Sequence, residues 1–390
     1  MLPLDDIKIL DLSTRAPGPF CSMALSDLGA DVLLVEAPAG TGSLGPGLEG
    51  DAAVRSAALN PLRRNKRSIV LNLKDEEARA LFYRLAEDTD VVMEGFRPGV
   101  SQRLGVDYDT LKGINQRIVY CSISGYGQDG PYSQLPGHDV NYLSFAGVLG
   151  VIGSRDGQPA IPYNLIADFA SGGLLSAMSI LSALWVRQRT GQGQYIDISL
   201  ADGSMYLLAD VVGSYYATGV VPRPGTMRLN GGSPDYQAYR CKDGKYLSIG
   251  SLEEKFWVNT CAALGREDMI ERRNSEPDAV LAELREIFGA RGRDEWFELL
   301  ADKDTCVSKV NTVDELESDP QVQARGMMID VPGPDGRPIP QVGIAANLKG
   351  TPGRVRSAGP APGAQTREVL KTLGVAAEEI ERLHASGAVV

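Results

Sequence analysis

Residues 9–36 of the chain read ILDLSTRAPGPFCSMALSDLGADVLLVE, an apolar run, a loop, an amphipathic stretch and a second apolar run. This order predicts strand, helix and strand, the unit that joins two parallel strands of one sheet. The turn after the first strand contains Ala16-Pro17-Gly18-Pro19, whereas a dinucleotide-binding turn needs G-x-G-x-x-G so that its backbone can approach the pyrophosphate. The segment therefore predicts an α/β sheet and argues against a nicotinamide-dependent dehydrogenase.

The same alternation continues through the first half of the chain. Strands are predicted at residues 8–13, 31–36, 68–73, 91–94, 118–124 and 195–200, and helices at 20–28, 75–87 and 168–188. Strands that alternate with helices predict a doubly wound α/β sheet. Further along, QAYRCKDGKYLSIGS (237–251) predicts a hairpin with Asp243-Gly244 at its turn. Helices are then predicted at 253–264, 277–289, 294–300 and 366–373.

Two stretches rich in glycine and proline, 219–234 and 331–362, divide the second half of the chain. Such composition is typical of linkers and loops. We therefore predict a large doubly wound α/β domain at 1–200, a linker at 201–225, and a smaller α+β domain inserted at 226–325. Residues 326–390 are predicted to form a second linker and a C-terminal return to the large domain.

Composition narrows the class of protein. The chain has 390 residues, of which 43% are hydrophobic, enough for a large core. With 39 basic and 50 acidic residues its net charge is −11, which argues against a nucleic-acid partner. Its five cysteines form no C-x-x-C pair and it has two histidines, so we expect reduced thiols and no metal site. No signal-peptide pattern is apparent and serines interrupt the most apolar helix, so we predict a cytoplasmic protein without a membrane span.

A basic island, PLRRNKRSIVLNLK (61–74), stands out in this acidic chain. Its arginines suit phosphate groups because the guanidinium fork matches their oxygens. Arg97 and Arg103 in GFRPGVSQRLG (95–105) form a second candidate, since loops at the strand ends of an open α/β sheet are where ligands usually bind. A solvated loop is the alternative for both, and the residues alone leave the two interpretations equally open.

His138 lies in GHDVNYLSFAGVLG (137–150), whereas the other histidine, His384, is close to the C-terminus. A buried structural histidine is one interpretation of His138. Asp168 in NLIADFASGG (164–173) is predicted at the start of a helix, where free N–H groups stabilise negative charge, although an ordinary N-cap has the same pattern. The small residues after it let another group approach. A histidine and a carboxylate on opposite faces of a substrate can remove a proton next to a carbonyl group and return it with inversion.

Seven segments in one order carry a resemblance to a known family. They are APGPFCSMALSDLGADV, RRNKRSIVLNLK, GFRPGV, SGYGQDGP, GHDVNYLSFAGVLG, NLIADFASGG and RQRTGQGQYIDISLADG. Through them the chain resembles the α-methylacyl-CoA racemases, within the family III CoA transferases, over nearly its whole length. The resemblance implies an interlocked homodimer, an acyl-CoA thioester substrate of lipid metabolism, and no cofactor, since CoA is part of the substrate. It also implies interconversion of (2R)- and (2S)-2-methylacyl-CoA through an enolate.

The resemblance assigns site residues as well. It implies that His138 and Asp168 are the two bases and that Glu253, in GSLEEKFW, orients the histidine. The enolate oxygen would be held by backbone amides near the helix start at Asp168. The residues implied to bind substrate or CoA are Lys66, Arg67, Ser68, Ile69, Phe96, Arg103, Gly137, Asp139, Val140, Asn141 and Tyr142.

The chain departs from the family at Ala37, where many relatives carry an arginine that contacts the nucleotide. Either Arg63 or Arg64 replaces that arginine, or CoA binds more weakly. Two other functions stay open. One is a CoA transferase with Asp168 as nucleophile, in a group that does not usually pair this aspartate with a G-H-D histidine, and the other is a silent CoA-binding protein. The presence of both His138 and Asp168 favours the racemase.

Overall fold

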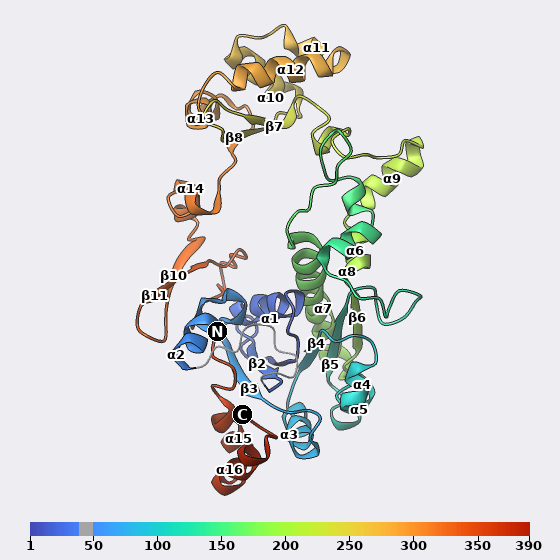
Figure 1. Cartoon of the computed structure of the whole chain (residues 1–390), viewed down its shortest axis with the longest axis vertical. Coiled ribbons are helices and arrows are strands. Elements are labelled where there is room, and N and C mark those ends of the chain that lie inside the picture. Colours follow the sequence, from blue (N-terminus) through green and yellow to red (C-terminus); the bar gives the residue numbers. More distant parts are fainter. Residues whose placement is uncertain (39–49) are drawn as a thin grey trace. The chain divides into compact units, whose positions relative to one another are not determined.

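The computed structural model describes residues 1–38 and 50–390, which form two compact units (Figure 1). Unit 1 comprises Met1–Phe145, Tyr163–Tyr206 and Pro320–Val390, and unit 2 comprises Ala146–Pro162 and Leu207–Asp319. Both units are assembled from segments that are distant in sequence, so neither is one continuous stretch.

A six-stranded parallel sheet forms the centre of unit 1, in the order β3-β2-β1-β4-β5-β6 (Figure 1). Its strands are β1 Lys8–Asp11, β2 Asp31–Glu36, β3 Lys66–Val70, β4 Val91–Glu94, β5 Val119–Ser124 and β6 Tyr195–Ser199. The predicted parallel α/β sheet is confirmed. The strand order reverses between β1 and β4, and in open α/β sheets ligands bind at this point, beyond the carboxyl ends of the strands.

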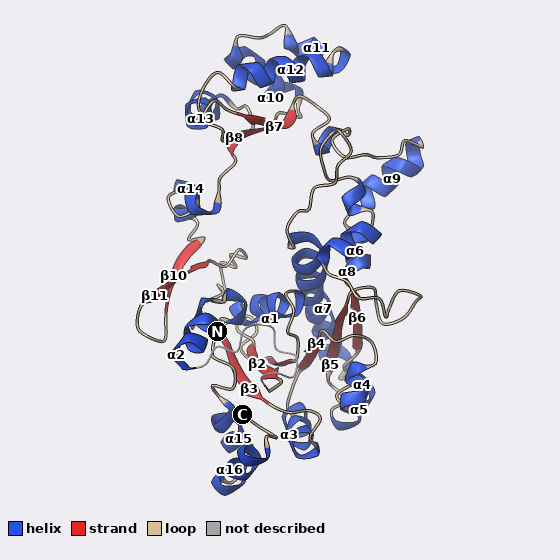
Figure 2. Cartoon of the chain, in the orientation of Figure 1, coloured by secondary structure: helices blue, strands red, loops and turns tan. Residues whose placement is uncertain are grey.

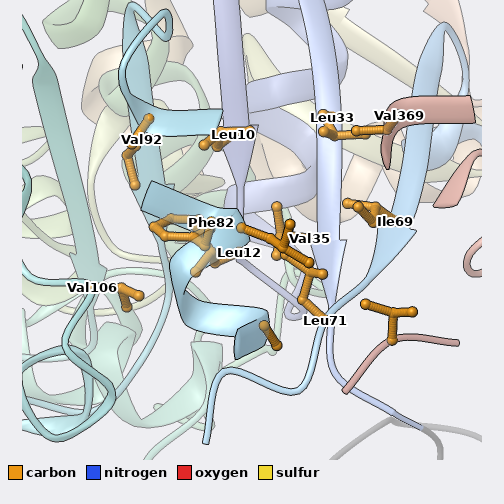
Figure 3. Close-up of a cluster of buried hydrophobic side chains, with 14 of the residues drawn as sticks. Leu10, Leu12, Leu33, Val35, Ile69, Leu71, Phe82, Val92, Val106 and Val369 are labelled. Atoms are coloured by element: carbon orange, nitrogen blue, oxygen red, sulfur yellow. The ribbon is translucent and has the colours of Figure 1, made fainter. Parts of the chain in front are cut away.

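Helices cover both faces of the sheet because its strands are apolar on both sides. Leu10, Leu33 and Ile69 pack on one face, in the core cluster drawn in Figure 3. The helices that contribute to this cluster are α3 Glu76–Ala86, α5 Tyr108–Ile114, α15 Thr366–Thr372 and α16 Ala377–Ser386. The opposite face is contacted by α1 Pro17–Asp27 and α7 Leu175–Thr190.

The remaining elements of unit 1 connect or extend the sheet. They are α2 Gly50–Leu59, η1 Pro61–Arg63, α4 Val100–Leu104, α6 Asp139–Phe145, η3 Leu165–Leu174, α8 Leu200–Tyr206, α14 Pro320–Ala324, β10 Met328–Pro332 and β11 Pro338–Val342. Strands β10 and β11 form an antiparallel hairpin where the sequence predicts a linker. The prolines in this hairpin argue against strands in the sequence, because proline is tolerated in a strand only where the N–H group needs no partner.

Unit 2 contains a three-stranded antiparallel sheet, β7 Tyr236–Arg240, β8 Tyr246–Gly250 and β9 Val307–Lys309. Figure 2 labels β7 and β8. Its helices are α9 Ala209–Thr218, α10 Glu254–Leu264, α11 Met269–Ser275, α12 Pro277–Phe288 and α13 Arg293–Leu300. Short 3-10 turns lie at Val148–Gly150, Arg228–Asn230, Ala301–Lys303 and Val313–Glu315. Trp257, Phe288 and Trp296 anchor a core of its own. The predicted β7–β8 hairpin and the three helices after it are confirmed.

The continuous helical segment Leu165–Thr190 is long and apolar enough to cross a bilayer by length and composition alone, although 44% of its apolar window is buried inside the protein. Ile180 and Leu184 are buried, and the helix contacts β5 and β6. In its last turn the buried Arg187 pairs with Asp90 at 2.7 Å. These are the features of a helix packed on a sheet.

Candidate active site

Loops that follow β1, β4 and β5 meet at the carboxyl edge of the sheet. The N–H of Leu12, just after β1, donates to the Met93 carbonyl of β4 at 2.8 Å. A Cβ atom at Gly95 would lie 3.6 Å from Ser13 Cβ, so the loops after β1 and β4 are in contact. The strand-order reversal and these loops make this edge the candidate site.

His138 precedes α6 and its side chain is exposed. Its backbone N–H donates to Asn141 Oδ1 at 3.0 Å, and its carbonyl accepts the Asn141 N–H at 2.8 Å. The Tyr142 hydroxyl donates to the Gly137 carbonyl at 2.6 Å, and a Cβ at Gly137 would lie 2.7 Å from the Tyr142 ring. Asn141 and Tyr142 therefore hold the backbone of this loop, and the imidazole stays exposed.

Asp168 lies inside a π-helical segment, η3, that runs from Leu165 to Leu174 and continues into α7. The prediction that the helix starts at Asp168 is wrong, because the helix begins three residues earlier, after Asn164. The Asn164 Nδ2 donates to Asp168 Oδ2 at 3.1 Å and so orients the carboxylate. Asp168 itself is half-buried. π-helical turns are rare and often occur at functional sites.

The small residues after Asp168 serve packing. A Cβ at Gly172 would lie 2.5 Å from Pro17 Cβ, and a Cβ at Gly173 would lie 2.6 Å from Phe20 Cδ1. Both contacts are with α1, and Phe20 also stacks on Phe169 with ring centroids 4.7 Å apart. The group that these glycines let approach is therefore helix α1.

The Asp139 side chain forms a hydrogen bond with the backbone amide of Asp168. Its Oδ2 accepts the Asp168 N–H at 3.0 Å, and its side chain is 5% exposed. Oδ1 has no hydrogen-bond partner among residues 1–38 and 50–390. The Asp168 N–H is therefore already bonded to Asp139, and the expectation that backbone amides near this helix start hold the enolate oxygen stays a prediction for the other amides.

His138, Asp139 and Asp168 form one electrostatic group. Burial raises the pKa of Asp168 above its ordinary value, the Asn164 hydrogen bond opposes this rise, the Asp139 charge adds to it, and His138 lowers the pKa. Burial likewise raises the pKa of Asp139. The structure thus brings the two predicted bases together, with a second carboxylate beside them.

Three residues predicted to contact CoA have buried side chains. Ile69 is fully buried in the sheet core. Ser68 Oγ donates to Glu36 Oε2 at 2.5 Å. The Lys66 ammonium donates to Ser22 Oγ at 2.5 Å and lies 3.8 Å from Asp11, and burial lowers its pKa to about 8. The side chains of Lys66, Ser68 and Ile69 therefore serve internal contacts.

The arginines of the basic island have different neighbours. Arg67 pairs with Asp31 at 2.7 Å and stays partly exposed. It follows Lys66 in β3, so the two side chains point to opposite faces of the sheet. Arg64 is buried against Asp27 at 2.5 Å. Arg63 instead forms two hydrogen bonds with Glu36, of 2.9 and 2.8 Å, at the end of β2. Of the two proposed replacements for the family arginine at position 37, Arg63 is therefore the one beside that position.

The loop after β4 contains the other predicted CoA residues. The Phe96 N–H donates to Glu94 Oε2 at 2.6 Å, and Arg103 is exposed in α4. Glu94, which sequence analysis missed, is 2% exposed, and burial raises its pKa to about 7. The feature of the sequence that could have identified Glu94 is a carboxylate at the end of an apolar strand.

Glu253 lies in unit 2, directly before α10, with an exposed side chain. Its backbone carbonyl accepts the N–H groups of Phe256 and Trp257 at 3.1 Å each. His138 and Asp168 belong to unit 1, so the predicted catalytic residues are divided between the units. Within the described part of the chain, no group of three or more His, Cys, Asp or Glu residues could hold a metal ion.

Comparison with known proteins gives consistent matches. The model of the CoA-transferase family III matches residues 4–366. The chain is 34% identical to the alpha-methylacyl-CoA racemase of Homo sapiens, over 98% of this chain and 97% of that protein. It is 33% identical to the succinate–glutarate CoA-transferase of Agrobacterium fabrum, over 97% of each. The crystal structure of a CAIB/BAIF family protein from Brucella suis is 31% identical with a TM-score of 0.81, covering 95% of this chain and 99% of that one.

Proposed function

The chain belongs to the CoA-transferase family III, and on this basis we propose that it is a racemase that interconverts (2R)- and (2S)-2-methylacyl-CoA thioesters. One observation carries the proposal. His138 and Asp168 come from different elements, yet the Asp168 N–H donates at 3.0 Å to Asp139, the residue directly after His138, so the fold holds the two residues close together. Two acid–base groups on different structural elements can lie on opposite faces of the substrate carbon, so one can remove a proton from one face and the other can deliver a proton to the opposite face.

In the proposed reaction, one base takes the proton from C2 of the acyl group. The electron pair of the broken C–H bond forms the enolate of the thioester. The second group then delivers a proton to the opposite face of C2, and the two groups exchange roles for the reverse direction. Burial raises the pKa of Asp168, which makes its carboxylate a stronger base than one in water. The substrate supplies its own CoA, so no further cofactor is assigned.

We also propose that the protein works as a homodimer, interlocked as the family resemblance implies. Leu174, Met178, Leu181 and Trp185 are exposed and follow one another at intervals of about one helical turn, so they form an apolar stripe on Leu165–Thr190. Contiguous exposed apolar residues often mark protein interfaces. In such a dimer Glu253 would orient His138, the role that the resemblance assigns to it. A cytoplasmic location stays part of the proposal.

The second candidate is a CoA transferase in which the Asp168 carboxylate attacks the thioester carbonyl. The C–S bond would break, CoA thiolate would leave, and an acyl anhydride would remain on Asp168. The transferase from Agrobacterium fabrum, as similar to this chain as the racemase, favours this candidate. The partnership of His138 with Asp168 favours the racemase, because the anhydride route needs no second base on the opposite face.

Substitution of each base tests the proposal. His138→Ala and Asp168→Ala should each abolish racemisation of both enantiomers, by on the order of 100-fold or more, while the dissociation constant of the thioester stays within a few-fold of the wild-type value. His384→Gln is the matched control, because His384 lies in α16, away from the candidate site. Racemisation at a near-normal rate by His138→Ala would refute the two-base role.

A further inference from the structure

A cavity of about 280 Å³ lies in unit 1 at the amino edge of the parallel sheet. Its lining includes Lys8 and Asp31, the first residues of β1 and β2. Because all strands of this sheet are parallel, their amino ends share one edge and their carboxyl ends the other. The candidate active site is at the carboxyl edge, so this cavity is a separate feature of the fold.

The inner surface of the cavity is aliphatic. Leu33 of β2 and Val369 of α15 line it and point toward one another (Figure 3). Leu85 of α3 and Leu373, just after α15, extend this surface. Leu33 and Val369 are buried, whereas Leu85 and Leu373 are only partly buried. A ligand in the cavity would therefore meet leucine and valine side chains from a strand and two helices.

The rim of the cavity carries charged side chains. Arg67, which sequence analysis assigned to CoA, lines this rim and pairs with Asp31 at 2.7 Å. Lys8 pairs with Asp88. Arg84, in the last turn of α3, is also on the rim, but it forms no ion pair within residues 1–38 and 50–390. The rim pairs therefore leave the Arg84 charge without an acidic partner.

We propose that this cavity binds a small monocarboxylic acid with an aliphatic chain. Arg84 uses an N–H of its guanidinium to donate to the Leu373 carbonyl, which holds the side chain over the cavity. The side chain is exposed, and its remaining N–H groups form the planar donor set that matches a carboxylate. The aliphatic chain would lie against Leu33, Leu85 and Val369, where it leaves water.

The two parts of the cavity select this class of ligand together. An inorganic anion such as phosphate would use the Arg84 charge but gain nothing from the aliphatic surface. A neutral alcohol would use that surface and leave the charge unpaired. Ligand sites usually have volumes of about 300–1,000 Å³, and this cavity lies at the small end of that range. It therefore suits a free acid of short or medium chain length and excludes a whole acyl-CoA.

Isothermal titration calorimetry of the full-length protein tests the proposal with octanoate, octan-1-ol and acetate. Octan-1-ol keeps the chain and lacks the charge, and acetate keeps the charge and lacks the chain. Arg84→Gln is the test variant. Arg79→Gln is the matched control, because Arg79 is in the same helix and also donates to a backbone carbonyl, that of Leu73, but does not line the cavity.

We expect the wild type and Arg79→Gln to bind octanoate about 10-fold or more tightly than either octan-1-ol or acetate. Arg84→Gln should weaken octanoate by about 10-fold and leave octan-1-ol unchanged. Equal octanoate affinity in the wild type and Arg84→Gln would place the acid elsewhere, for instance in the candidate active site, and overturn the proposal. Acetate or octan-1-ol binding as tightly as octanoate, or no binding of octanoate at all, would also overturn it.

Discussion

The Asp139 carboxylate, at the start of α6, accepts the backbone N–H of Asp168 at 3.0 Å, so a second acidic side chain lies against the first turn of the long helix. The bond fixes the backbone of Asp168, and it also places a like charge beside it. The Asp139 charge raises the pKa of Asp168, although burial is the larger cause. Asp139 therefore positions the proposed base and tunes its proton affinity.

Asp139→Asn separates these two effects. The amide oxygen can still accept the Asp168 N–H, whereas the negative charge is gone. Removal of a like charge lowers the pKa of Asp168. The acid limb of kcat/KM against pH should therefore move to lower pH, because Asp168 stays ionised further into acid. Asp139→Ala also loses the hydrogen bond, and we expect it to lower the free energy of unfolding by about 1 kcal/mol. A shift of the acid limb to higher pH in Asp139→Asn would contradict this assignment.

Lys66 and Arg67 should respond differently to substitution although they are neighbours. Lys66→Met leaves the buried carboxylate of Asp11 without its cation, which should cost about 3–5 kcal/mol in the free energy of unfolding. Arg67→Gln breaks a partly exposed pair with Asp31 and should cost less than about 1 kcal/mol. Urea denaturation of the two variants gives both values. A Lys66→Met protein as stable as the wild type would show that the internal pair does not form.

Gly173→Ala tests the close packing between α1 and the π-helical segment. The new Cβ would lie 2.6 Å from Phe20 Cδ1 and 3.3 Å from the Pro17 carbonyl oxygen. We expect a loss of about 1–3 kcal/mol in stability and a lower rate, because Asp168 lies in the same segment. Gly213→Ala in α9 is the control, since nothing lies within 4 Å of its Cβ position. That substitution should leave stability unchanged or raise it by up to about 1 kcal/mol. Equal melting temperatures for both variants would argue against the packing role.

The sheet could be predicted closely from sequence, and the side-chain environments could not. Strands β2 and β4 lie at the predicted residues, because short apolar runs between polar turns leave few alternatives. The start of the long helix was placed too late, since its π-helical turns accompany contacts with α1, which is distant in sequence. The burial of Lys66 could not be predicted from sequence either. A cluster of charges indicates a surface until the partner, here Asp11, is placed beside it by the fold.

The candidate site could likewise be predicted from sequence only in part. His138 and Asp168 stood out by residue type and by resemblance, and the hydrogen bond between the Asp168 N–H and Asp139, the neighbour of His138, holds their segments together. Asn164 was missed as a partner of Asp168, because the hydrogen bond between them depends on the π-helical turn that follows Asn164 in the folded chain.

Proton transfer at C2 is the central claim, and deuterium incorporation tests it most directly. One enantiomer of a 2-methylacyl-CoA is incubated with the enzyme in D₂O, with no acceptor acid present. We predict deuterium at C2 together with loss of optical purity. Absence of deuterium at C2 would contradict the racemase and would favour the transferase, with Asp168 as nucleophile.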